Sequence, residues 1–309
     1  MTDQPKLRLG TRHSPLAMAQ AREARARLCA AHGWPESAID LMPVRASGDR
    51  IQDRPLAEIG GKALWTKELD QWLAEGWIDG AVHSMKDVET IRPDVLAIAA
   101  VLPRADVRDV LVGAASVAEI PRGARVGTSA PRRAAQILHF RPDCDVVTFR
   151  GNVATRLAKL AAGEADVTLL AAAGLARLEE TGVGTALDPT EWLPAPAQGA
   201  IGIECRADDD NARALFAAID DAPSRATVMA ERALLAGLGG TCHSPIAAHS
   251  VREGESIVLR AILFSPDGAE RVDGECRFAP GDHEPPATLA ADLLARATPG
   301  IAAHFDGPA

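Results

Sequence analysis

The chain has 309 residues, more than one typical hydrophobic core accommodates, which suggests two or three domains. Its formal net charge of −9 argues against a protein that binds nucleic acid with its whole surface, and its 4% aromatic content leaves few side chains on which single strands could stack. The first residues contain no apolar stretch typical of signal peptides, and no window approaches about 18 consecutive apolar residues. We therefore expect a cytoplasmic protein that does not span a membrane.

Residues 6–102 are predicted to alternate between strands and helices. Ser14 is placed to cap a helix whose first turn contains Pro15 and which runs to about residue 31. The helical spacing of apolar residues predicts a second helix around 64–73, after a long, charged and Gly-rich loop at 46–62. The strands expected in this part cover 6–11, 39–45, 78–83 and 95–102.

A second run of alternating elements begins near Val110. Its strands are expected at 125–128, 145–149 and 166–171, and its helices at 131–140, 152–161 and 173–179. Such alternation is typical of parallel sheets with crossover helices, whose ligands lie at the carboxyl ends of the strands. Polar clusters stand at those ends, at 11–14, 84–87, 128–133 and 150–156. We therefore expect a binding site built from these turns.

The C-terminal part follows a Pro-punctuated stretch at 193–198. A strand at 200–204 and a helix from about Asp209 come first. A further helix over 225–238 ends at Gly239-Gly240, a strong stop signal. Strands at 246–250, 257–264 and 272–278 and a closing helix at 284–296 then predict a small sheet with its own helix.

Basic residues are concentrated between 122 and 159, where eight cations minus two acids give a local charge of +6. Two groups of them lie in predicted strand-to-helix turns, at 127–133 and 149–156. Helix starts offer free backbone N–H groups and arginines add bidentate donors, so this placement favours a site for carboxylates or phosphates. A solvated basic helix face is the alternative. The block contains Arg122, Arg125, Arg132, Arg133, Arg141, Arg150, Arg156 and Lys159, with Asp143 and Asp145 as its acids.

The five cysteines, at 29, 144, 205, 242 and 276, are widely spaced and form no Cys-x-x-Cys motif, so we expect no zinc or redox site. Cys242 differs from the others because it lies in a Gly-rich loop directly after a predicted helix. Its thiol is therefore expected to be accessible for covalent modification, whereas the others fit packed small hydrophobes. The adjacent His243 does not by itself establish a Cys–His nucleophile.

Asp87 follows a predicted strand together with Lys86. A carboxylate beside a fixed cation can transfer protons or stabilise a developing positive charge. A surface Lys–Asp pair in a turn is the alternative. Residues 60–65 lack the spacing of a phosphate-binding loop, and we interpret Lys62 as part of a lid over a cleft.

Seven short motifs occur in one order along residues 6–250. They include His83-Ser-Met-Lys-Asp-Val88 and Arg150-Gly-Asn-Val-Ala-Thr-Arg156. The others lie at 11–17, 127–133, 173–178 and 198–206 and in the Cys242 loop. Any one motif is modest support, but the ordered set closely resembles the hydroxymethylbilane synthase, or porphobilinogen deaminase, family.

The resemblance implies an α/β fold. Two lobes like those of type II periplasmic binding proteins, with mixed sheets, would be followed by a small C-terminal α+β domain carrying the cysteine loop. Lobe 1 would comprise 1–102 and 199–221, lobe 2 would comprise 106–194, and the C-terminal domain would comprise 225–309. The resemblance favours a monomer, with neither nucleic acid nor membrane as a partner.

The resemblance also implies a transferase of porphyrin and haem biosynthesis with a dipyrromethane cofactor attached to Cys242 by a thioether. The reaction would join four porphobilinogen molecules head to tail onto this primer with loss of ammonia, and water would then release hydroxymethylbilane. Each pyrrole ring carries two carboxylates, so a primer of two rings plus four added rings presents twelve. Arginine suits bidentate carboxylate binding, which would account for a basic segment in an acidic chain.

Residue roles carry over from the family motifs. Asp87 would be the catalytic residue, facing the pyrrole N–H groups and stabilising the cationic rings that form when ammonia leaves. The cofactor-binding residues would be Lys86, Ser129, Arg132, Arg133 and Arg156, together with the attachment residue Cys242. The substrate-binding residues would be Arg12, Ser14, Arg150, Arg156, Arg177 and Gln198.

The chain departs from the family pattern in two notable places. Ser-Gly-Asp at 47–49 replaces the common Arg-Gly-Asp, and Leu-Gly-Gly-Thr-Cys at 238–242 replaces Leu-Glu-Gly-Gly-Cys. Two other function classes compete with the synthase. A non-catalytic, two-lobed anion-binding protein would need neither Asp87 nor Cys242, and a nucleic-acid binder would use the basic segment and lose affinity steeply with salt.

Overall fold

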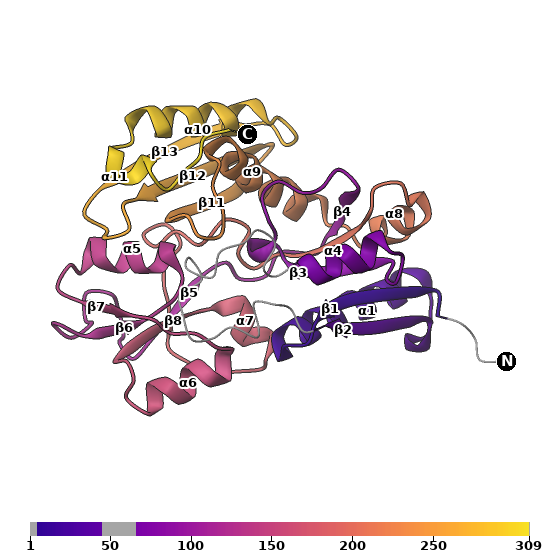
Figure 1. The fold of residues 1–309 in the computed structure, drawn as a ribbon, viewed down its shortest axis with the longest axis horizontal. Helices are drawn as coiled ribbons and strands as arrows, with labels where there is room; N and C mark the ends of the chain where they lie inside the picture. Colours follow the sequence, from indigo (N-terminus) through magenta and orange to yellow (C-terminus); the bar gives the residue numbers. More distant parts are fainter. Residues whose placement is uncertain (1–4, 45–65, 309) are drawn as a thin grey trace. The chain divides into compact units, whose positions relative to one another are not determined.

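The computed structural model describes residues 5–44 and 66–308 (Figure 1). The predicted lid, with Lys62 and the departure at 47–49, lies outside the described residues. The described chain divides into two compact units, which we call the first unit (5–44, 66–105 and 200–225) and the second unit (106–199 and 226–308). The second unit contains both the predicted lobe 2 and the predicted C-terminal domain, and the boundaries between three domains stay a prediction.

The described part of the first unit is built on a mixed sheet of β1 (Leu7–Arg12), β2 (Ile39–Val44), β3 (Gly80–Ser84), β4 (Leu96–Val101) and β10 (Ile201–Arg206). The strand order is β2-β1-β3-β10-β4, in which the first three strands are parallel and β10 is antiparallel to both of its neighbours. The helical elements are α1 (Pro15–His32), η1 (Glu36–Ala38), α4 (Lys67–Ala74), η2 (Met85–Asp87) and α8 (Asp210–Ala217).

Helices cover both faces of this sheet. On one face, Leu28 of α1 and Phe216 of α8 pack against strand residues that include Val82. On the other face, Leu69 of α4 packs against Ala81, the neighbour of Val82 in β3. Successive residues of a strand point to opposite faces, so both sides of the sheet are buried, as expected where parallel strands are joined by helices.

The second unit contains a sheet of β5 (Asp109–Val112), β6 (Arg125–Gly127), β7 (Asp145–Val147), β8 (Val167–Ala171) and β9 (Thr185–Ala186). Its order is β7-β6-β8-β5-β9, in which β6 is parallel to β7 and β8, and β5 is antiparallel to β8 and β9. The accompanying helices are α5 (Pro131–Phe140), α6 (Val153–Ala161) and α7 (Ala172–Arg177). The described parts of the two sheets therefore share one topology, with three parallel strands, an antiparallel strand and an edge strand.

A third sheet, in the C-terminal part, is an antiparallel meander of β11 (Ile246–Glu253), β12 (Ser256–Phe264) and β13 (Arg271–Phe278). Helices α9 (Ala222–Leu238), α10 (Glu284–Arg296) and α11 (Pro299–Ala302) accompany it. Leu234, Leu259 and Leu293 form part of their shared core. The meander lies against α5, where His139 Nδ1 is 2.9 Å from the Gly268 carbonyl oxygen.

Local sequence signals predicted several element ends correctly. Ser14 Oγ accepts a hydrogen bond from Ala17 N at 3.3 Å and caps α1, which ends at Gly33 with φ 64°. Gly239, with φ 63°, follows the last residue of α9. These left-handed conformations suit glycine because it has no Cβ. The predicted fold class, α/β with mixed sheets and a small C-terminal α+β part, is confirmed.

Several elements differ from the predicted ones. The short strands β5 and β9 were not predicted, and α9 begins at Ala222 rather than at 225. β5 and β9 are hard to recognise because these short strands owe their place to distant partners rather than to a local pattern. Among the described helices, none combines the length and the apolar character needed to cross a lipid bilayer.

Candidate functional site

Two predicted site residues of the first unit lie close together. Arg12 ends β1, and Asp87 lies in η2, directly after β3. Because β1 and β3 are parallel neighbours, their carboxyl ends share one edge of the sheet, and Arg12 Nη1 stands 4.0 Å from Asp87 Oδ2. The Asp87 side chain is 35% exposed, so its carboxylate remains accessible to a ligand.

Ser14 and Lys86 are half-buried and lie near this pair in the sequence. Ser14 Oγ serves as an acceptor in capping α1, and its hydroxyl group retains a donor. Gln20, on the buried face of α1, donates from Nε2 to Ser84 Oγ at 2.7 Å. This bond ties α1 to the end of β3. The sequence signal for Gln20 is a polar residue among the buried alanines Ala17, Ala21 and Ala24.

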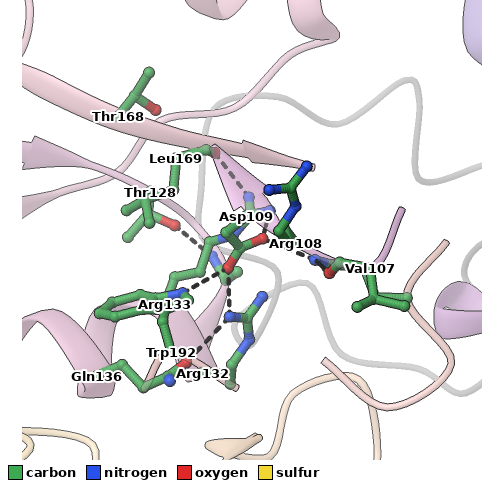
Figure 2. A network of polar contacts seen from close by, with 12 residues as sticks. Val107, Arg108, Asp109, Thr128, Arg132, Arg133, Gln136, Thr168, Leu169 and Trp192 are labelled. Carbon is green, nitrogen blue, oxygen red and sulfur yellow. Dashed lines mark hydrogen bonds and ion pairs between the residues drawn. The ribbon is translucent and has the colours of Figure 1, made fainter. Parts of the chain in front are cut away.

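In the second unit, the buried carboxylate of Asp109 lies at the centre of a polar network (Figure 2). Arg132 Nη1 donates to its Oδ2 at 2.5 Å, and Arg133 Nη2 donates to its Oδ1 at 2.6 Å. Trp192 Nε1 donates to Oδ2 and Gln198 Nε2 donates to Oδ1, both at 2.9 Å. The network therefore joins the start of β5, the first turn of α5 and the loop that precedes β10.

The electrostatic balance of the network leaves a positive charge. Burial alone would raise the pKa of Asp109, but Arg132 and Arg133 outweigh this effect and hold the pKa well below its ordinary value. One ionised carboxylate against two guanidinium groups leaves a net charge of +1. Within the described residues, the buried Nε atoms of both arginines have no hydrogen-bond partner. A carboxylate supplied by a ligand would neutralise this cluster.

The structure brings the two arginine-containing turns of the second unit together. β6 and β7 are parallel neighbours, and Ser129 Oγ, after β6, accepts a hydrogen bond from Phe149 N at 3.1 Å. Gly127 makes this approach possible, because a Cβ there would overlap the Phe149 ring. Arg150, next to Phe149, is only 6% exposed.

The remaining predicted ligands of the second unit make backbone contacts. Arg156 Nε donates to the Gly151 carbonyl at 3.0 Å, and Arg177 Nη2 donates to the Gly199 carbonyl at 3.2 Å. A guanidinium group has five N–H donors, so these contacts are compatible with binding a ligand. Gln198 supports the Asp109 network, and its contact with substrate stays a prediction.

Part of the basic block serves local ion pairs instead of a ligand site. The acids involved lie partly outside residues 122–159, so the sequence count of +6 overstated the charge left for a ligand. Such exposed pairs contribute little to stability. The pairs are Arg125–Asp166 at 3.2 Å, Arg141–Asp143 at 2.8 Å and Lys159–Glu164 at 3.7 Å.

Cys242 is the one exposed cysteine among the five, all of which lie in the described part of the chain. Burial raises the pKa of the Cys205 and Cys276 thiols to about 11, which keeps them protonated and unreactive at neutral pH. The Cys242 turn is fixed by Thr241 N, which donates to Ser244 Oγ at 3.0 Å. Burial lowers the pKa of the neighbouring His243, so its ring is neutral at pH 7.

The Cys242 loop departs from the family pattern at Gly239, and the structure gives a reason. Gly239 has a positive φ, and a Cβ at this position would overlap the backbone of Gly307. The C-terminal segment thus occupies the space that a side chain would need. Glycine is therefore required here, where the family commonly has glutamate.

Comparisons with protein families match nearly the whole chain. The family model described as "Porphobilinogen deaminase, dipyromethane cofactor binding domain" matches residues 7–214. The model described as "Porphobilinogen deaminase, C-terminal domain" matches residues 225–295.

Curated relatives agree with this assignment, and the solved structures are distant. Porphobilinogen deaminase of Sphingopyxis alaskensis is 56% identical over 97% of this chain and 96% of its own length, and that of Paracoccus denitrificans is 50% identical over 88% of each. Among solved structures, the BvgS VFT2 domain of Bordetella pertussis covers 70% of this chain and 85% of its own, with 16% identity and a TM-score of 0.40. A periplasmic His/Glu/Gln/Arg/opine family-binding protein of Silicibacter pomeroyi, in complex with lysine, covers 69% and 88%, with 19% identity and a TM-score of 0.39. The two family models and the identity to these relatives together show that the chain belongs to the porphobilinogen deaminase family.

Proposed function

We propose that this chain condenses four porphobilinogen molecules onto a dipyrromethane primer held covalently by Cys242, and then releases hydroxymethylbilane with water. Family membership makes the chain a transferase of tetrapyrrole biosynthesis, with a domain that binds a dipyrromethane cofactor. The non-catalytic anion binder considered from the sequence is therefore wrong. The observation that carries the proposed attachment site is the exposure of Cys242, in contrast to the buried or half-buried positions of the other cysteines.

The residues of the second unit fit a ligand rich in carboxylates. The Asp109 network keeps one uncompensated positive charge in a buried place. Arg132 and Arg133 would hold a cofactor carboxylate, with Ser129 and Arg156 as further contacts from this unit. Lys86, in the first unit, is a cofactor-binding residue that we propose from the family motif alone. When bound, the dipyrromethane supplies the pyrrole carbon to which the first substrate ring is joined.

The residues of the first unit fit the charge that develops in the reaction. Loss of ammonia from porphobilinogen leaves a cationic ring, and the accessible Asp87 carboxylate can stabilise it and accept a proton. Arg12, whose Nη1 lies 4.0 Å from Asp87 Oδ2, would bind a substrate carboxylate. Ser14, Arg150, Arg156, Arg177 and Gln198 are the remaining proposed substrate contacts. A monomeric state and a cytoplasmic location stay predictions from the sequence.

Intact-protein mass spectrometry tests the attachment site. Wild-type protein from a host that makes porphobilinogen should carry the added mass of a dipyrromethane, and Cys242→Ala should lack it. Cys276→Ala is the matched control, because this half-buried thiol should not be used and the adduct should remain. An unmodified wild-type mass, or an adduct that persists in Cys242→Ala, would overturn the proposal.

A further inference from the structure

The turn that carries Lys86 and Asp87 is flanked by two side chains that meet one buried carboxylate. Glu204 of β10 is fully buried. His83, before the turn, places Nε2 3.2 Å from Glu204 Oε2. Arg92, after the turn, donates from Nε to Oε1 at 2.8 Å and from Nη2 to Oε2 at 3.0 Å. Glu204 thus contacts the chain on both sides of the turn.

Arg92 extends this connection to α4. Its side chain is 7% exposed, and Nη2 also donates to Asp70 Oδ1 at 2.5 Å. Nη1 reaches Thr66 Oγ1, at the N-cap of α4, at 3.3 Å. The segment after Asp87 is therefore fixed to both the sheet and a helix.

A steric contact on β10 supports the same turn. Met85 N donates to the Ala200 carbonyl at 3.0 Å, and the Met85 side chain is buried against Gly202. A Cβ on Gly202 would overlap Met85 Sδ. The lack of a side chain at Gly202 therefore leaves room for Met85, the first residue of η2.

The register of the sheet explains why these contacts coincide. Gly202 pairs with His83 across the antiparallel strands β10 and β3. Residues opposite each other, and those two positions away, point to the same face of a sheet. Gly202 and Glu204 therefore lie on the face of the sheet from which His83 projects, and Met85 contacts Gly202. The pairing of β10 with β4 also shifts between Ile203 and Glu204, an irregularity of the kind that re-aims side chains.

We infer that β10 positions the turn that carries Lys86 and Asp87. In this inference, Glu204 is a positioning residue that fixes the Asp87 carboxylate through His83 and Arg92. Gly202, which has no side chain, leaves the space that Met85 occupies. This inference rests on the proposed role of Asp87. Neither Glu204 nor Gly202 contacts the reacting groups in this role. Both act by setting where the turn lies, and a displacement of about 1 Å at a reacting group can lower a rate on the order of 100-fold.

Glu204→Gln tests the electrostatic part, because it preserves shape and removes the charge that Arg92 meets. We expect kcat for hydroxymethylbilane formation to fall about 10-fold to 100-fold, with KM within about twofold and the Cys242 adduct retained. Asp79→Asn is the matched control. Asp79 also accepts bonds from an arginine, Arg8, but it lies at the opposite end of β3 from the turn. Its kcat should stay within about twofold of wild type.

Coupling to Asp87 separates positioning from a general loss of stability. If Glu204 acts through Asp87, the effects of Glu204→Gln and Asp87→Glu on log kcat should be clearly less than additive. Full additivity, or a wild-type kcat in Glu204→Gln, would overturn the inference while leaving the proposed function intact. A wild-type protein without turnover or adduct would instead contradict the proposed function.

Gly202→Ala tests the steric part and serves if Glu204→Gln does not fold. The added methyl group should displace Met85 and lower kcat at least about 10-fold with the adduct retained. Gly80→Ala is its control, because a Cβ there would overlap the Phe216 ring at the other end of β3. Gly80→Ala should lower stability and leave the kcat of the folded fraction within about twofold. Equal kcat values for the two variants would contradict the inference.

Discussion

The ion pair between Asp87 and Arg12 is loose enough for a ligand to rearrange it. Their closest charged atoms are 4.0 Å apart, and the carboxylate is about one-third exposed. A ligand carboxylate that draws Arg12 away would leave Asp87 facing the ligand's cationic ring. In the proposed function, the pair would serve both the binding of substrate and the stabilisation of positive charge.

Asp87→Ala should lower turnover at least about 100-fold while leaving the fold and the Cys242 adduct intact, because it removes the carboxylate proposed to stabilise the cationic ring. Steady-state assays, with circular dichroism as the test of folding, measure this. Asp94→Ala is the control, since Asp94 is an exposed carboxylate a few residues further along. Retained turnover in Asp87→Ala would refute the assigned role.

At the scale of elements, Asp109 fixes the first turn of α5 through a contact between residues far apart in the sequence. It begins β5 and holds Arg132 and Arg133 in the first turn of a helix that starts more than 20 residues later. The sequence indicated both arginines, because they stand in a strand-to-helix turn. It gave no signal for Asp109, since β5 was not recognised and the pairing depends on tertiary structure.

Asp109→Asn should lower the free energy of unfolding by about 3–5 kcal/mol, because two buried guanidinium groups lose their carboxylate. Urea denaturation measures this difference. Asp106→Asn is the matched control, because Asp106 also pairs with an arginine, Arg108, but at an exposed site. It should change stability by less than about 1 kcal/mol. Similar losses in the two variants would show that the buried network is not a major source of stability.

The contrast between features with local causes and features that depend on tertiary structure also holds for other elements. The Ser14 cap, the Pro15 start and the Gly239 stop could be predicted because their physical causes lie within a few residues. The turns after β6 and β7 could be placed together because parallel strands end at one edge of a sheet. The net charge of the basic block could not be predicted, since Glu164 and Asp166, which pair with two of its cations, lie beyond its end. Glu204 lies within the motif at 198–206, but nothing in the motif indicates its ion pair, and its partner Arg92 has no local signal.

At the scale of the whole molecule, the two five-stranded sheets repeat one plan. In each, an antiparallel strand carries a buried carboxylate in ion pairs: Asp109 of β5 pairs with Arg132 and Arg133, and Glu204 of β10 pairs with Arg92. Burial would raise the pKa of Glu204, but His83 and Arg92 lower it to about 2. Both carboxylates thus have a folded-state pKa below the ordinary value, and both couple folding to pH in the same direction.

Stability should therefore fall in acid. A carboxylate whose pKa is lower in the folded state contributes its full stabilisation above the unfolded pKa of about 4.5, and this is lost as pH falls towards 2. For Glu204 the loss should be on the order of 3 kcal/mol. Urea denaturation between pH 6 and pH 3, at roughly unit steps, follows it, and Glu204→Gln should flatten the slope. An unfolding free energy that does not change below pH 4.5 would contradict this coupling.

The position of β10 in the sheet has a consequence for synthesis on the ribosome. This strand lies between β3 and β4, yet it follows them by about a hundred residues of chain. Every described strand of the β5–β9 sheet emerges earlier, between residues 109 and 186. The sheet of β1 to β4 therefore cannot be completed until β10 has been translated. By then the β5–β9 sheet already has all of its described strands.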